Sequence, residues 1–87
     1  MKQQKVQIVG YYSTACFCQK PALKPVITNY YPRFYFKKAV REFCRINNLR
    51  LLWVNSKAKV AGAVLDRPCD HRRKQEIRIT WKLCYES

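Results

Sequence analysis

Lysine and arginine side chains are the residues whose spacing most clearly indicates a chemical role. Lys37, Arg41 and Arg45 follow one another at intervals of four, and three consecutive cations occupy positions 72–74. A guanidinium group donates two parallel hydrogen bonds to a phosphate, and a lysine adds a mobile point charge. This arrangement predicts phosphate contacts with release of counterions. The predicted contact set is Lys37, Lys38, Arg41, Arg45, Arg72, Arg73, Lys74, Arg78 and Lys82.

Tyrosines next to these cations add a second chemical feature. Tyr30, Tyr31 and Tyr35 flank an arginine, and rings beside cations can stack on unpaired bases. The alternative is that aromatic side chains form the core, which we expect of Phe34 and Phe36. The sequence contains no RNP1-like run, GxxG loop or helix-turn-helix spacing, so it indicates no established nucleic-acid module.

Four side chains could ligate zinc. Cys16 and Cys18 form a C-x-C, while Cys69 and His71 form a C-x-H, which together supply three thiolates and one imidazole. The single intervening residue is shorter than the usual spacing of two to four, so structural zinc is the less favoured interpretation. A disulfide from Cys16 or Cys18 to Cys69 is the alternative in an oxidising compartment. We expect reduced thiols, no cofactor, and Cys44 as a core thiol.

Catalysis has few candidate residues. Asp66, Asp70 and Glu76 flank the basic loop, and these clustered carboxylates beside Lys74 could hold magnesium for phosphodiester cleavage. Surface ion pairs are the simpler interpretation of these carboxylates. His71 is the only histidine and could act as a general base, but no separate His, Ser or Cys arrangement orients it. We therefore expect no enzymatic activity, with a metal-dependent nuclease as the disfavoured alternative.

The elements that position these residues follow from apolar periodicity. Residues 5–12 and 26–31 predict two strands, the second ended by a proline. Apolar residues three and four apart predict a helix over 34–47, which stops at two asparagines and has a basic outer face. Three further strands are predicted at 49–54, 59–65 and 77–85.

The order β-β-α-β-β-β predicts an α+β fold. Short connections favour a mainly antiparallel sheet packed on the one amphipathic helix. The strand at 6–12 is a candidate for an exposed edge that could add to a partner's sheet, and we expect Gly62 to mark a bulge or a close backbone approach. With 87 residues, no repeat and no flexible linker, the chain is expected to form a single compact basic domain spanning 1–87.

The high positive net charge indicates that the partner is an anion. The chain has 18 Lys and Arg against 5 Asp and Glu, a net charge of +13, which attracts anions. Its composition, 48% hydrophobic and 14% aromatic, excludes a disordered basic tail. No apolar run approaches the ~20 residues that cross a bilayer, and the N-terminal apolar stretch is too short for a signal peptide. We expect a cytoplasmic or nuclear protein with no membrane partner.

These observations favour a small accessory or regulatory protein that binds RNA or DNA through phosphates. The alternative is an interaction protein that docks on an acidic surface of a larger enzyme or nucleoprotein complex and inhibits or modulates it. Electrostatics alone fits both functions. The second predicts one tight protein partner and only weak, salt-sensitive affinity for nucleic acid.

Overall fold

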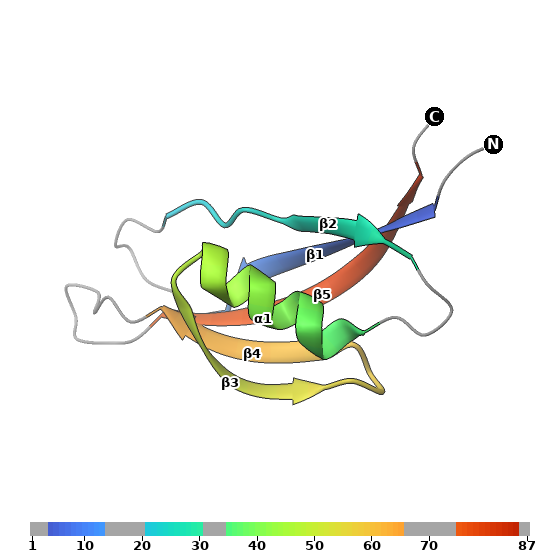
Figure 1. Cartoon of the computed structure of the whole chain (residues 1–87). Helices are drawn as coiled ribbons and strands as arrows, with labels where there is room; N and C mark the ends of the chain where they lie inside the picture. The colour runs from blue at the N-terminus through green and yellow to red at the C-terminus, as the bar shows by residue number, and fades with distance from the viewer. Residues whose placement is uncertain (1–3, 14–20, 31–34, 66–74, 86–87) are drawn as a thin grey trace.

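The computed structural model describes residues 4–13, 21–30, 35–65 and 75–85, and Figure 1 shows them as one helix against one five-stranded antiparallel sheet. The predicted α+β class is therefore confirmed. In chain order the elements are β1 (Gln4–Tyr12), β2 (Val26–Asn29), α1 (Phe36–Ile46), β3 (Leu49–Asn55), β4 (Val60–Leu65) and β5 (Gln75–Tyr85).

The C-terminal strand lies in the middle of the sheet. The strand order is β2-β1-β5-β4-β3, and β5 pairs with β1 from Tyr85 opposite Gln4 to Ile77 opposite Tyr12. The candidate edge at 6–12 is wrong for residues 6–8, because β2 pairs with residues 5–8 on one side of β1 while β5 pairs along the whole strand on the other. Among the described residues, no strand pairs with residues 9–12 on the β2 side. Such long-range pairing leaves no trace in the local pattern of a strand, so it was not visible in the sequence.

One face of the sheet is covered by α1, as Figure 1 shows. Phe36, Val40, Phe43 and Cys44 recur at helical spacing and are buried against β1, β4 and β5, in a core that includes Ile79. Burying a side chain such as phenylalanine or valine stabilises the fold by roughly 1.5–3 kcal/mol. The amphipathic helix is thus held by tertiary packing.

Two asparagines end the helix. Asn48 adopts φ 56°, a left-handed conformation that asparagine tolerates better than most residues. The Asn47 side chain donates a hydrogen bond to the Phe43 carbonyl oxygen at 2.9 Å and accepts one from the Lys24 backbone N–H at 2.7 Å. The predicted stop at 47–48 is confirmed. The same amide joins the segment before β2 to the end of α1.

The opposite face of the sheet is not covered by any helix of the described residues. Strand alternation directs Val6 and Ile8 of β1 toward α1, so that Tyr11 points to the other side. We call this side the helix-free face. Within the described part of the chain, no helix has the length and apolar composition to span a membrane.

Candidate functional site

The first candidate surface lies on the outer side of α1. Lys37, Lys38 and Arg41 are exposed because they occupy helix positions opposite the buried stripe. Together with Tyr35 and Ser56 they line a hollow of about 680 Å³ between the start of α1 and the β3–β4 turn. None of the described residues that line this hollow is acidic. We call it the helix hollow; its lining is Tyr35, Phe36, Lys37, Lys38, Arg41 and Ser56.

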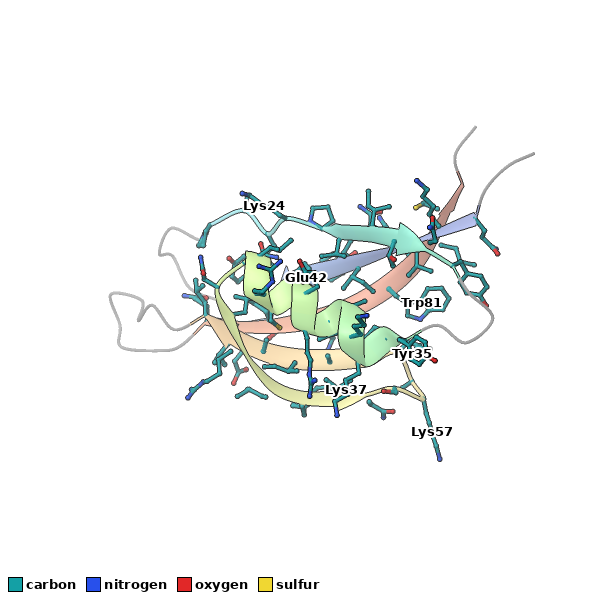
Figure 2. All side chains as sticks on the ribbon, in the orientation of Figure 1. Lys24, Tyr35, Lys37, Glu42, Lys57 and Trp81 are labelled. Carbon is teal, nitrogen blue, oxygen red and sulfur yellow. The ribbon has the colours of Figure 1, made fainter. Side chains whose placement is uncertain are left out.

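The β3–β4 turn adds positive charge beside the helix hollow. Asn55 Oδ1 accepts hydrogen bonds from the backbone N–H groups of Lys57 and Ala58, both at 3.1 Å, which fixes the turn. Lys59 Nζ lies 6.0 Å from the centroid of the Phe36 ring, at the outer limit of a cation–π contact. Figure 2 shows Lys37 extending from the helix on the side of β3, with Lys57 at the tip of the turn.

Arg45 differs from the other helix cations. It forms an ion pair with Glu42, in which its Nε donates to Oε2 at 3.1 Å. This pairing raises the pKa of Arg45 and lowers the pKa of Glu42. Arg45 is also absent from the described lining of the helix hollow. Of the predicted helix set, Lys37, Lys38 and Arg41 therefore converge, and Arg45 does not.

Arg78 and Lys82 lie on the other side of the sheet. Ile77 and Ile79 of β5 are buried toward α1, so the alternating positions Arg78 and Lys82 are exposed on the helix-free face. The cations predicted as a single contact set are consequently divided between two surfaces. The sequence predicted an exposed strand face for Arg78 and Lys82 but did not indicate that this face lies on the side of the sheet away from α1.

A row of register partners crosses the helix-free face. Tyr11 of β1 pairs with Arg78 of β5, Arg78 pairs with Gly62 of β4, and Gly62 pairs with Trp53 of β3. Directly paired residues project their side chains on the same face. We call these four residues the sheet row. Tyr11 is 57% exposed and Trp53 is 49% exposed, so both rings are accessible.

Gly62 seats the indole of Trp53. A Cβ atom at Gly62 would lie 2.3 Å from Trp53 Nε1 and 2.6 Å from Cε2, so the indole rests directly on the glycine backbone. The register of β3 shifts between Leu51 and Trp53, and Leu52 within the shift is 53% exposed. The close approach predicted at Gly62 is confirmed. A shallow cavity of about 240 Å³ adjoins the indole, lined by Ser13, Leu52, Trp53, Gly62, Ala63, Glu76, Ile77 and Arg78.

The two aromatic members of the sheet row were missed from the sequence. Tyr11 and Trp53 belong to strands whose apolar pattern indicated core, and only the sheet register brings them to one face. The available signal was Gly62, whose position inside an apolar strand indicated that something lies on its backbone. Of the predicted tyrosines, Tyr35 is 70% exposed in the helix hollow and Tyr30 is 39% exposed after β2.

The remaining predicted site residues lie outside the described residues. Within the described ranges, no group of three or more His, Cys, Asp or Glu side chains could hold a metal ion. Glu76, predicted beside the basic loop, borders the cavity next to Trp53. The predicted site residues outside the described ranges are Tyr31, Arg72, Arg73, Lys74, the zinc candidates Cys16, Cys18, Cys69 and His71, and the carboxylates Asp66 and Asp70. Phe34, which was expected in the core, also lies outside them.

Comparisons with protein-family models, curated proteins and solved structures find no match for this chain. Two surfaces of the described residues could bind a ligand: the helix hollow, which is basic, and the sheet row, which combines exposed rings with an arginine.

Proposed function

We propose that this protein binds RNA or DNA, mainly through phosphates, as a small accessory or regulatory protein of the cytoplasm or nucleus. The observation that supports this most strongly is the helix hollow. Lys37, Lys38 and Arg41 line it from one side of a single helix, and no described lining residue carries a negative charge. Glu42 lines an adjoining hollow with Tyr35 and Lys38, but its carboxylate is paired with Arg45, so the cations of the helix hollow favour an anionic ligand.

The chemistry of the helix hollow suits a phosphate backbone. Arg41 offers a planar pair of donors for one phosphate, while Lys37 and Lys38 follow neighbouring phosphates as mobile charges. Each phosphate neutralised contributes about 0.9 to the slope of log affinity against log salt on duplex DNA and about 0.7 on a single strand. Such contacts carry affinity but little sequence information.

Further cations extend the proposed phosphate surface. Arg78 and Lys82 add positive charge on the helix-free face. The proposal retains Arg72, Arg73 and Lys74 as contacts on the strength of the sequence, and replacing all three by alanine should lower affinity and flatten its salt dependence. Unchanged binding by that triple variant would remove the loop from the interface.

The test is a titration of the protein with single-stranded RNA, duplex RNA and duplex DNA over roughly 50 to 200 mM salt, the range in which phosphate-driven affinity falls steeply. The informative variant is Lys37→Ala with Arg41→Ala. Its matched control is Lys24→Ala with Arg45→Ala, which removes the same charge outside the helix hollow. Figure 2 shows Lys24 on the β2 side of the molecule, opposite Lys37.

The proposal expects the Lys37/Arg41 variant to lose about tenfold or more in affinity and to reduce the salt slope by about 1.4 to 1.8, for two phosphate contacts. The control should change both quantities much less. Equal losses in the two variants would show that net charge, and not the helix hollow, drives binding. Weak binding of the unaltered protein to all three nucleic acids, abolished at the higher salt, would instead favour the acidic protein partner.

A further inference from the structure

The helix-free face presents large apolar side chains to solvent in a small and highly charged protein. Tyr11, Leu52 and Trp53 are each about half exposed on this face. Exposed apolar groups that gather on one face commonly mark a binding surface. Two of the three are aromatic, and the sheet register places them in one row with Arg78.

We infer that the sheet row binds unpaired bases of a single-stranded nucleic acid, with Tyr11 and Trp53 as the stacking rings and Arg78 between them. This inference rests on the proposed nucleic-acid binding and names its substrate class. Stacking on exposed aromatic side chains beside cations is how proteins hold single strands without reading sequence.

The spacing of the row determines how a strand would lie on it. Adjacent strands are about 4.8 Å apart, so the backbones at Tyr11 and Trp53, three strand intervals apart, are separated by about 14 Å. This is too far for the two rings to sandwich one base. Each ring therefore takes its own base, and the nucleic acid runs across the strands from β1 to β3.

Charge on the same face complements that path. Arg78 lies between the rings, and Lys82 occupies the same face of β5. A strand whose bases contact the rings would bring its phosphates within reach of these cations. Arg78, Trp53 and Glu76 also border the 240 Å³ cavity, where the guanidinium can donate hydrogen bonds to the edge of a base and the carboxylate can accept one.

The row favours a single strand over a duplex for a steric reason. In a double helix the faces of the bases are stacked on one another, so an exposed ring cannot reach them. A duplex would be held by phosphates alone and would not need Tyr11 or Trp53. The rings should therefore matter for single strands only.

The test compares a short oligouridine with a duplex RNA of equal length. The variant Tyr11→Leu with Trp53→Leu keeps apolar bulk and removes both rings. Ile27→Ala is the control, because it removes an exposed apolar side chain that lies outside both the sheet row and the helix hollow. We expect the double variant to lose about fivefold or more per ring in affinity for oligouridine and to bind duplex RNA unchanged. The control should leave oligouridine affinity within about twofold of the unaltered protein.

The outcomes separate this inference from the proposed function. If the double variant bound oligouridine as well as the unaltered protein, or lost equal affinity for oligouridine and duplex, the sheet row would not be a binding site for unpaired bases. The proposed nucleic-acid binding would still stand. Absence of binding by the unaltered protein would overturn both.

A second measurement does not depend on the folding of the double variant. Trp53 and Trp81 are the two tryptophans, and Trp81 pairs with Ile8 on the helix side of the sheet. In a Trp81→Phe protein the emission reports Trp53 alone. Stacking predicts saturable quenching of this emission by oligouridine and not by duplex RNA. Unchanged emission at saturating oligouridine would contradict the inference.

Discussion

On each face of the sheet a glycine makes room for an aromatic ring, but the two rings differ in how deeply they are buried. On the helix-covered face, a Cβ at Gly10 would lie 2.7 Å from Phe43 Cζ, so this glycine admits a buried ring to the core. On the helix-free face, Gly62 admits the ring of Trp53, which remains half exposed. The first close approach serves packing. The second leaves an aromatic ring half exposed on the helix-free face.

The largest expected difference in the free energy of unfolding is between alanine substitutions of Phe43 and of Leu52. Phe43→Ala empties a fully buried site on the helix-covered face and should destabilise the protein by about 3–5 kcal/mol. Leu52→Ala, at a site 53% exposed, should change the free energy of unfolding by no more than about 0.5 kcal/mol. Urea denaturation measures both. A comparable loss in the two variants would show that the helix-free face also contributes to the core.

Substitution of the two glycines sharpens the same contrast. Gly10→Ala forces a methyl group against the buried Phe43 ring and should destabilise the protein by about 1–3 kcal/mol. Gly62→Ala displaces the Trp53 indole, which can move toward solvent, so its cost should be smaller. Gly62→Ala should instead weaken oligouridine binding. If it left that binding unchanged, the seating of the indole would have no functional role.

A smaller effect concerns Cys44 on the helix-covered face. Burial raises its pKa to about 11 from an ordinary value of 9.0, because the thiolate is poorly solvated there. Above pH 9 the unfolded chain therefore loses this proton before the folded chain does. The stability from the buried thiol is complete below pH 9 and is lost between about pH 9 and pH 11, up to roughly 2 kcal/mol.

Cys44→Ala provides the control for this pH dependence. Other titrating groups are common to both proteins, so the difference between their urea midpoints at pH 8 and pH 11 isolates the thiol. The stability advantage of the unaltered protein over the Cys44→Ala variant should be smaller at pH 11 than at pH 8, by an amount set by the pKa shift. If both proteins lost the same stability over this range, Cys44 would not be held in a desolvated environment.

The sequence predicted those features that depend on local pattern. The helix followed from the spacing of Phe36, Val40 and Phe43, and its end followed from Asn48, which needs only its own left-handed conformation. The α+β class rests on these local signals. The observed helix is shorter than the predicted 34–47, because helix ends depend on contacts beyond the periodic run.

The candidate site was harder to predict because it depends on long-range register. Tyr11, Arg78 and Trp53 are far apart in the chain and meet only through three pairings: β1 with β5, β5 with β4, and β4 with β3. No pattern in the sequence around Arg78 indicated that it lies on the face of the sheet opposite α1, and therefore away from Lys37. The helix cations, by contrast, were predictable as a group because one helical period sets all their positions.

The most direct test of the central claim is a residue-resolved NMR titration of the unaltered protein with oligouridine and, separately, with duplex RNA, at about 0.15 M salt, where weak surface electrostatics are screened. We predict saturable shifts of the Trp53 indole N–H and of the amides around Gly62 and Arg78 with oligouridine. Duplex RNA should shift the amides around Lys37 and Arg41 and leave the indole unchanged. Absence of saturable shifts at both surfaces would contradict the account.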